Sequence, residues 1–447
     1  MRFASFEEML RYHAVRTPQA PALKVGRGDT VQTVSYAALC ALIEERAVAL
    51  HATGKTCLGV LCDGTLACVI EIFAAVRAGL QLVLLNENVD PAQIAYTDID
   101  LLWGDAELIE ALAPALTGGV ADGKGKILFF TSGTTAKTKA VVLTEQSLCA
   151  SAFNGGSLLP LEQRDVLMCM LPLDHVFGFV CALLWGLSCG ACVALGRGPR
   201  HYFDDCAFFR PTVLSAVPML LGFLLQKQLL SASLRLVLIG AGDCAPQIPA
   251  ALRAKGIRVS FGYGLTETSS GVALSLGDDP YAMTVCPDDT VTLAPDGEIL
   301  IDSPTCMMTG YYKDPKATCA VLKDGILSTG DLGVFDANGL LHVTGRKKEI
   351  LVLSDGTKIF LPEYERALAA VLRDRDFAVV ESGGFPVLVL QGAETEREAL
   401  TAQLETVMKT LPIGRRLKAM YIVHDPLPRT ATGKIKRWAL QQKVGRQ

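Results

Sequence analysis

The sequence lacks a surplus of basic residues and a secretory leader, and each absence excludes a class of function. Lysine and arginine together number 42, against 46 aspartates and glutamates. A chain without excess positive charge has little with which to bind phosphate backbones, so nucleic acid is not an expected partner. Residues 1–18 carry acidic side chains early and no apolar run before a cleavage site, so we predict no signal peptide.

The sequence also lacks a cysteine pattern that would hold disulfides or zinc. Its 14 cysteines are scattered through apolar segments, where a free thiol behaves as a small hydrophobe. Cys189 and Cys192 form a CxxC pair, but no second pair and no nearby histidine completes a zinc site. We therefore expect reduced thiols and a cytoplasmic location.

One long run lacks charge altogether. Residues 176–196 read "VFGFVCALLWGLSCGACVALG", which is long enough to span a bilayer. Gly186, Ser188 and Gly190 interrupt this run, and "ACVAL" after them has the length and composition of a buried strand. We predict a buried helix followed by a core strand rather than a membrane span, which is kept as the alternative.

Helix-like segments and short apolar runs alternate through the first part of the chain. The helical pattern "YAALCALIEERAVALHATG" is followed by the apolar runs "CLGVLC" and "LQLVLLN". The same kind of run returns in "DVLMCMLPL", "TVLSAVP", "LRLVLIGAG" and "IRVSFGYG", each ending in turn residues. This alternation predicts βαβ units around parallel sheets, which bind ligands at the carboxyl ends of their strands.

The pattern changes after about Ala273. Short alternating strands with Asp-Gly and Asn-Gly turns, such as "DGILSTGDLGVFDANGLLHVTG", predict antiparallel hairpins. From "GRKKEILVL" onward, two helical and several strand patterns indicate a separate small α+β region. The expected fold class is α/β: residues 1–346 form a large domain of mostly parallel α/β sheets plus a small distorted β-barrel subdomain, and residues 347–447 form a mobile C-terminal α+β domain.

The segment "TSGTTAKTK" contains the parts of a polyphosphate cradle. Thr131, Ser132, Thr134 and Thr135 supply hydroxyls, Gly133 permits close backbone approach, and two lysines supply cations. The pattern of P-loop nucleotidases requires a glycine where this chain has Ala136, which excludes that class. On composition alone, a solvated Ser/Thr-rich turn is an equal alternative.

Two further segments contain residues suited to a nucleotide. In "FGYGLTETSS", Tyr263 could stack on a base and Glu267 could bind Mg²⁺, although a helix start capped by Thr266 explains the same residues. In "STGDLG", flanking glycines are expected to leave Asp331 exposed, and Arg346 follows fifteen residues later. The pair could bind ribose, or could be a surface turn and an ion pair.

A last segment, "LPRTATGKIKRWAL", brackets a polar loop between Pro428 and Gly433. The loop presents Lys434 ahead of a final amphipathic helix. A lone lysine on such a loop is most often simply solvated.

In their order, these segments resemble the motifs of the adenylate-forming enzymes, the superfamily that includes acyl-CoA synthetases, firefly luciferase and peptide-synthetase adenylation domains. The matching motifs are "TSGTTAKTK", "YGLTE", "STGDLG" with "GRKKE", and "PRTATGK". Weaker matches, "RTPQAPALKV", "LPLDHVFG", "GAGDCA" and "GEILIDSPTCMMTGYYKDP", extend the resemblance across nearly the whole chain. Within the superfamily the chain is most similar to fatty acyl-CoA synthetases.

The resemblance implies a nucleotide site and a set of catalytic residues. The nucleotide would be bound by Thr131, Ser132, Gly133, Thr134, Thr135, Lys139, Gly240, Ala241, Gly242, Tyr263, Gly264, Asp331 and Arg346. Among these, the 131–135 loop with Lys139 would hold the β- and γ-phosphates, and residues 240–242 with Tyr263 would sandwich adenine. Asp331 and Arg346 would bind the ribose.

The catalytic residues that the resemblance implies are Lys434, Thr266, Glu267 and His175. Thr266 would contact the α-phosphate, Glu267 would carry Mg²⁺, and His175 would border the carboxylate pocket. Lys434 would reach into the cleft during adenylation, and Lys348 would be the hinge about which the C-terminal domain swings to admit the thiol.

The phosphate loop departs from the family pattern at three positions. The family commonly has Gly, Pro and Gly where this chain has Ala136, Thr138 and Ala140. A non-glycine residue in a left-handed conformation costs on the order of 1 kcal/mol, so we expect weaker ATP binding rather than its loss.

The leading functional hypothesis is an AMP-forming ligase with Mg²⁺, ATP and coenzyme A as cofactor and co-substrates. It would convert a carboxylic acid, expected to be a fatty acid, to an acyl-adenylate and pyrophosphate, and would then transfer the acyl group to coenzyme A. Alternative hypotheses are transfer to the phosphopantetheine of an acyl carrier protein, an aryl acid of the o-succinylbenzoate type as substrate, and a nucleotide-binding homologue with weakened catalysis. An amino-acid substrate would need a carboxylate for its amine, and Asp174 is the candidate nearby.

Overall fold

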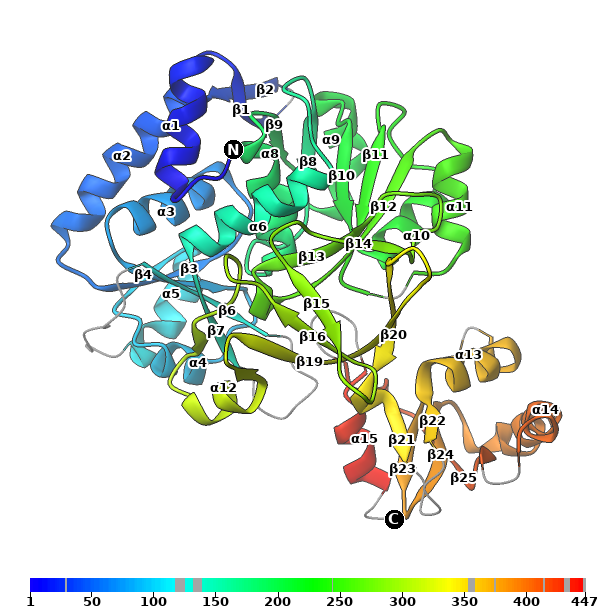
Figure 1. The fold of residues 1–447 in the computed structure, drawn as a ribbon. Coiled ribbons are helices and arrows are strands. Elements are labelled where there is room, and N and C mark those ends of the chain that lie inside the picture. The colour runs from blue at the N-terminus through cyan, green and yellow to red at the C-terminus, as the bar shows by residue number, and fades with distance from the viewer. Residues whose placement is uncertain are drawn as a thin grey trace.

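The computed structural model describes most of the chain: residues 1–28, 30–116, 125–131, 139–242, 244–352, 358–373, 375–412, 415–429 and 435–444. Two large sheets with their helices make up the part before residue 347, and a smaller unit follows it (Figure 1). The likeness of this mixed α/β architecture to solved structures, given below with the other comparisons, confirms the predicted fold class.

The larger sheet has 14 strands in the order β15-β16-β19-β20-β14-β13-β12-β11-β10-β8-β9-β1-β2, with β18 beside β19. Strands β8 to β12 and β1 pair in parallel with one another, and this half is bordered by two antiparallel pairings, that of β12 with β13 and that of β1 with β2. The bounds of this half are β1 Pro21–Arg27, β2 Thr30–Ser35, β8 Val166–Cys169, β9 Cys192–Leu195, β10 Val213–Ala216, β11 Leu236–Ile239 and β12 Arg258–Leu265.

The other half of this sheet is antiparallel, as the hairpin signals predict. Its strands are β13 Ser270–Ser275, β14 Met283–Val285, β15 Thr290–Leu293, β16 Glu298–Asp302, β18 Leu322–Lys323, β19 Ile326–Phe335 and β20 Leu341–Arg346. The long hairpin β19–β20 brings Asp331 directly opposite Arg346.

The second sheet has six strands in the order β17-β7-β6-β4-β3-β5. They are β3 Cys57–Leu61, β4 Gln81–Leu85, β5 Leu101–Trp103, β6 Lys126–Phe130, β7 Ala140–Thr144 and β17 Gly310–Tyr311. Side chains alternate between its faces, so Leu84 and Phe129 enter the main core while Leu85 and Leu128 enter a smaller core behind the sheet.

The main core lies between the two sheets and extends under the surrounding helices. These helices are α1 Phe6–Arg16, α2 Tyr36–Ala52, α3 Leu66–Arg77, α4 Pro91–Tyr96, α5 Ala106–Leu112, η1 Ala113–Ala115, α6 Glu145–Leu158, α7 Val176–Gly178, η2 Phe179–Leu184, α8 Trp185–Ser188, η3 Pro199–His201, α9 Tyr202–Phe209, α10 Pro218–Gln226, α11 Gln247–Ala254, η4 Thr266–Thr268 and α12 Pro315–Val321. Capping hydroxyls of Ser5, Ser35 and Thr65 accept hydrogen bonds from the first turns of α1, α2 and α3.

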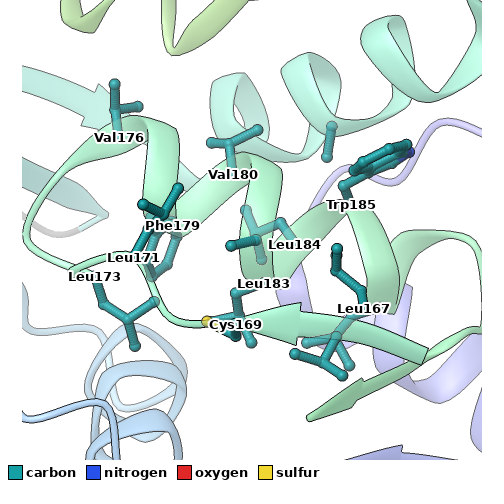
Figure 2. Packing of buried hydrophobic residues seen from close by; sticks show 14 of the residues in the cluster. Leu167, Cys169, Leu171, Leu173, Val176, Phe179, Val180, Leu183, Leu184 and Trp185 are labelled. Carbon is teal, nitrogen blue, oxygen red and sulfur yellow. The ribbon is translucent and has the colours of Figure 1, made fainter. Parts of the chain in front are cut away.

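The uncharged run 176–196 forms a helical segment, α7 to α8, followed by the core strand β9, as predicted. Its middle turn, η2, is π-helical, and all its residues except the partly buried Cys181 are inside the core (Figure 2). Across the described ranges, no helix combines the length and the apolarity that crossing a bilayer would take. All 14 cysteines are free thiols, as predicted.

The C-terminal unit is built on the three strands β23 Phe377–Ser382, β24 Phe385–Gln391 and β25 Ala419–Val423. Its other elements are η5 Lys347–Glu349, β21 Ile350–Val352, β22 Lys358–Phe360, α13 Leu361–Leu372, η6 Glu394–Glu396, α14 Arg397–Thr410 and α15 Arg437–Val444. Helices α13 and α14 cover one face of the sheet and α15 covers the other (Figure 1), so the unit has two small cores of its own. The domain boundary at 346/347 and movement of this unit stay predictions.

The ring of Phe360 contacts the main chain at the junction with the larger part. A Cβ atom added to Gly345 would lie 2.0 Å from this ring, and Gly345 has φ +156°. Lys347, two residues after Gly345, forms ion pairs with both Asp296 (2.6 Å) and Glu298 (2.5 Å). This contact and these ion pairs fix the end of β20 where the chain leaves the larger sheet.

Candidate functional site

The carboxyl ends of the strands bring together the segments that the sequence singled out. Thr131 follows β6, Gly240 follows β11, and residues 263–267 form the end of β12 and the turn η4. Strands β11 and β12 are adjacent and parallel, so residues 240–242 and Tyr263 lie on neighbouring strand ends. This is the edge of a parallel sheet at which ligands bind.

The two ends of the predicted phosphate loop are joined to each other. The backbone N–H of Thr131 donates to the carbonyl of Lys139 (2.9 Å). The ammonium of Lys139 lies 4.1 Å from the centre of the Tyr311 ring, a cation–π distance. Ser132, Gly133, Thr134 and Thr135 lie outside the described residues, so their predicted contacts with phosphate stay predictions.

Glu267 is held from two directions. The Tyr311 hydroxyl donates to Glu267 Oε1 (2.7 Å), and the backbone N–H of Met308 donates to the Glu267 carbonyl (2.8 Å). Both partners come from the segment that ends in β17, far along the chain from η4. The Glu267 carboxylate and the Lys139 ammonium therefore contact the same side chain, that of Tyr311.

The turn that carries Thr266 and Glu267 is tight and strained. Ser269 has φ 52° and Ser270 has φ 113°, values that side chains other than glycine adopt rarely. A Cβ atom at Gly264 would lie 1.6 Å from the Ser270 carbonyl, so only glycine fits there. The alternative of a helix start capped by Thr266 does not hold, because Thr266 is the first residue of η4 and Leu265 is its N-cap residue, whose N–H donates to the Thr268 hydroxyl.

Tyr263, Asp331 and Arg346 form a second polar group. The Tyr263 hydroxyl donates to Asp331 Oδ2 (2.9 Å), and Arg346 Nε lies 2.6 Å from Asp331 Oδ1. Burial, and then the charge of Asp331, raise the pKa of Tyr263. The expectation that Asp331 is exposed is wrong: its residue is 2% exposed, because the cross-strand partner Arg346 and the ring of Tyr263 cover it.

Gly240 lies against an aromatic ring from another segment. A Cβ atom at Gly240 would lie 2.8 Å from the Phe177 ring, so that ring occupies the space above the glycine. Ala241 has φ 63°, a left-handed conformation that occurs at binding sites more often than elsewhere. The ring of Phe177 thus lies next to the strand end at which adenine is predicted to bind.

His175 precedes α7 at the same edge, and its imidazole is 31% exposed. Its neighbour Asp174 is buried, and Asp174 Oδ2 accepts a hydrogen bond from Asn86 Nδ2 (3.0 Å). His175 Nε2 is 3.9 Å from the same oxygen. Asp174 is thus committed to protein partners.

The two apolar segments that were candidates for an acyl pocket differ. The side chains of Phe179, Leu183 and Trp185 are inside the main core and pack against Leu167 and its neighbours (Figure 2). They are therefore core residues. On α10, Leu221 and Leu224 are also buried, whereas Met219 is 72% exposed.

The predicted roles of Lys434 and Lys348 remain predictions. Lys434 lies outside the described residues, so its entry into the cleft stays a prediction. The backbone of Lys348 lies in η5, directly after the ion-paired Lys347. Its role as a hinge also stays a prediction.

The donor set fits Mg–ATP. One carboxylate (Glu267) and one ammonium (Lys139) both contact Tyr311, and Mg²⁺ is commonly held by one or two carboxylates together with substrate phosphates. Within the described ranges, no three His, Cys, Asp or Glu side chains gather into a metal site of their own. The residues therefore suit a metal that arrives with a polyphosphate.

Sequence reasoning missed Tyr311 and Phe177 as parts of this site. Tyr311 belongs to a strand of two residues, too short for any periodic pattern. Phe177 stands in a run that reads as core throughout. The resemblance of "TGYYKDP" and "LPLDHVFG" to the family was the available signal, and it assigned neither ring a role.

Comparisons with known proteins show what the chain is similar to. A model of the AMP-binding enzyme family matches residues 126–312. An indoleacetate–CoA ligase of Aromatoleum aromaticum is 28% identical, with 98% of each chain covered. A 2-succinylbenzoate–CoA ligase of Bacillus cytotoxicus is 31% identical over 70% of this chain and 69% of its own.

Solved structures share the fold. The o-succinylbenzoate coenzyme A synthetase of Bacillus subtilis in complex with AMP has a TM-score of 0.81 and 24% identity, covering 97% of this chain and 98% of that one. The same enzyme in complex with ATP and a magnesium ion has a TM-score of 0.79 at 24% identity, covering 97% and 98%.

Proposed function

This chain belongs to the AMP-binding enzyme family, and from that premise we propose that it activates an aromatic carboxylic acid with ATP and passes the acyl group to coenzyme A. Its class is that of the AMP-forming acid–thiol ligases. The observation that carries the proposal is the convergence of Lys139, Tyr311 and Glu267 from three separate segments beside the pair of Tyr263 and Asp331.

In the first half-reaction, a carboxylate oxygen of the acid attacks the α-phosphorus and pyrophosphate leaves. The barrier is lowered mainly by cations and donors aimed at the phosphoryl oxygens. Lys139 and Thr131 would bind the β- and γ-phosphates, Thr266 would contact the α-phosphate, and Glu267 would hold Mg²⁺. When bound, Mg²⁺ supplies positive charge that offsets the charge of the phosphates.

The same residues orient the nucleoside. Asp331, fixed by Arg346 and by the Tyr263 hydroxyl, would accept hydrogen bonds from the ribose. The ring of Tyr263 would cover one face of adenine, with residues 240–242 on the other. Lys434 would supply a further cation to the α-phosphate and would leave before the thiol attacks the acyl-adenylate and AMP departs.

An aromatic acid is favoured over the fatty acid expected from sequence. Residues 179–185 were a candidate lining for a long acyl chain. Their side chains pack into the main core and leave no such lining. The exposed edge beside His175 instead offers the flat ring of Phe177 next to Gly240, where an aromatic ring could stack. Relatives named for indoleacetate and 2-succinylbenzoate support the same choice.

An amino-acid substrate is disfavoured by the same geometry. Its ammonium would need a free carboxylate, and the nearby acid Asp174 already accepts a hydrogen bond from Asn86 inside the protein. That hydrogen bond and the burial of Asp174 leave its carboxylate less available to an ammonium. Transfer to a carrier protein in place of coenzyme A stays a prediction.

Pyrophosphate exchange into ATP, measured with a panel of acids, tests the proposal. The panel would pair aryl acids such as indoleacetate and o-succinylbenzoate with fatty acids of matched carbon number and with amino acids. We expect exchange with aryl acids and thioester formation once coenzyme A is added. Exchange with fatty acids alone would overturn the substrate class, and no exchange with any acid would overturn the ligase assignment.

A further inference from the structure

Tyr311 contacts two groups of the predicted ATP site at once. Its hydroxyl donates to Glu267 Oε1 (2.7 Å), and the ammonium of Lys139 lies 4.1 Å from its ring centre. The carboxylate and the cation therefore share one rigid side chain. Neither the motifs nor the predicted roles of the chain assign Tyr311 a function.

The ring itself is firmly placed. Tyr311 pairs with Val141 of β7, and its backbone N–H donates to the Thr318 hydroxyl (2.9 Å). The residue is 8% exposed and belongs to the main core. Because β7 begins directly after Lys139, the strand that carries the cation also holds the ring.

The phenol is placed to donate to Glu267. Its hydroxyl directs its hydrogen to one oxygen of the Glu267 carboxylate. The second carboxylate oxygen can then face a ligand.

We propose that Tyr311 is a positioning residue of the ligase site: its hydroxyl orients Glu267 toward the metal, and its ring holds the Lys139 ammonium beside the phosphates. The inference rests on the proposed function for the identity of the nucleotide and the metal. It adds a link between the phosphate loop and the carboxylate of η4.

The adjacent Tyr312 provides a matched control. Its hydroxyl donates to Asp98 Oδ2 (2.8 Å), and Tyr312 lies in the smaller core behind the second sheet. Consecutive residues of a strand point to opposite faces, so Tyr312 turns away from Glu267 and Lys139. Removal of its hydroxyl tests the loss of a buried phenol without touching the site.

The test is metal and nucleotide binding by the full-length protein. Mn²⁺ serves as the probe, titrated with ATP present and followed by electron paramagnetic resonance. Tyr311→Phe keeps the ring and removes the donor to Glu267. We expect the Mn²⁺ requirement to rise about tenfold, the size of losing one hydrogen bond to a charged group, with metal-free ATP affinity within twofold of wild type.

Tyr311→Leu removes the ring as well, so it should also weaken metal-free ATP binding by about threefold, the lower range for a cation–π contact. Tyr312→Phe should leave both quantities unchanged. The proposal would be overturned if Tyr311→Phe had the same Mn²⁺ requirement as wild type, or if Tyr312→Phe raised that requirement as much as Tyr311→Phe.

Two further measurements separate the inference from loss of folding and from the proposed function. In a Glu267→Gln background, Tyr311→Phe should have no additional effect on Mn²⁺, and additive effects would contradict a role through Glu267. Should Tyr311→Phe not fold, Lys139→Met is expected to lower metal-free ATP affinity with the Mn²⁺ requirement unchanged, and a change in both contradicts separate tasks for ring and hydroxyl. If the wild-type protein binds Mn–ATP but shows pyrophosphate exchange with no acid, the proposed function is contradicted and the inference about Tyr311 is not.

Discussion

The two faces of the candidate site are held together by different forces. The nucleotide face consists of Lys139, Tyr263, Glu267, Tyr311, Asp331 and Arg346. Its polar groups are joined in pairs by hydrogen bonds, ion pairs and a cation–π contact. The acid face consists of Asp174, His175 and Phe177, and Gly240 lies where it meets the nucleotide face. There the closest contact is the packing of an aromatic ring on a glycine, and the one buried carboxylate is turned toward Asn86.

Because the two faces are held differently, they tolerate different substitutions. A polar pair works at one distance and one charge, so a change to either partner leaves the other unsatisfied. An apolar wall changes shape with any change in side-chain volume and leaves no unpaired charge behind. We infer that the nucleotide face fixes the reaction and the acid face sets which acid enters.

The largest effect is expected at Glu267. Glu267→Gln keeps the shape of the side chain and removes its charge, so the acceptor for the metal is weakened. ATP–pyrophosphate exchange at saturating acid should fall by about 100- to 1,000-fold, as for loss of one group that stabilises transition-state charge.

Glu145→Gln is the control for that change. Glu145 is a partly buried glutamate whose Oε2 accepts from the Phe6 N–H (3.0 Å), away from both faces. Its exchange rate should stay within twofold of wild type. A fall of less than fivefold in Glu267→Gln would mean that the nucleotide face does not depend on this charge.

Asp289 lies outside both faces, so its titration changes the stability of the fold and not the chemistry of the site. Asp289 accepts hydrogen bonds from Ser303 (2.5 Å) and Asn154 (2.9 Å), and burial raises its pKa from 3.8 to about 6. The folded protein thus binds more protons than the unfolded chain between pH 4 and 6. This stabilisation is fully present below pH 3.8 and is lost as the pH rises through about 6, by on the order of 2 to 3 kcal/mol.

Urea unfolding at several pH values would measure this change. The stability of wild type relative to Asp289→Asn should fall by that amount from pH 4 to pH 7, because the asparagine does not titrate. A constant difference would contradict the raised pKa. Exchange activity that follows the same pH window would show that unfolding, and not either face, sets the pH profile.

Gly240 lies on the border between the faces, and its substitution decides to which it belongs. Gly240→Ala puts a Cβ against the Phe177 ring, which must move. We expect the KM for the acid to rise about tenfold, in line with 1 to 3 kcal/mol for overpacking, and the KM for ATP to change less than twofold.

The added substitution Phe177→Leu should recover part of the acid affinity by making room for the new methyl group. If Gly240→Ala instead raises the KM for ATP more than that for the acid, residue 240 belongs with adenine, as predicted from the sequence. That result would break the division between the faces.

The smallest effect is expected at Tyr263. Tyr263→Phe keeps the ring and removes the hydrogen bond to Asp331, which Arg346 still holds. ATP affinity measured by calorimetry should fall about fivefold. Tyr364→Phe, which loses a hydroxyl bonded to the Arg415 carbonyl in the C-terminal unit, should leave ATP affinity unchanged; an equal loss in both variants would argue against a local effect.

The sequence predicted those parts of the structure that depend on residues close together in the chain. The apolar runs that end in turn residues became β3, β4, β8, β10, β11 and β12, and Asp331 was found because "STGDLG" is contiguous. Its burial was not predicted, because it depends on the register of β19 with β20 and on Tyr263 from another strand. Tyr311 was missed for the same reason, since its contact with Glu267 spans 44 residues.

The contact between Gly345 and Phe360 also constrains how this chain can diverge. Position 345 leaves no room for a Cβ atom while an aromatic ring stands at 360, and its φ of +156° already favours glycine. Position 360 can become smaller without any change at 345, whereas a larger residue at 345 requires the ring at 360 to shift or to be lost. Divergence at the junction is therefore asymmetric: loss of the ring asks nothing of residue 345, and loss of Gly345 asks for a change at 360.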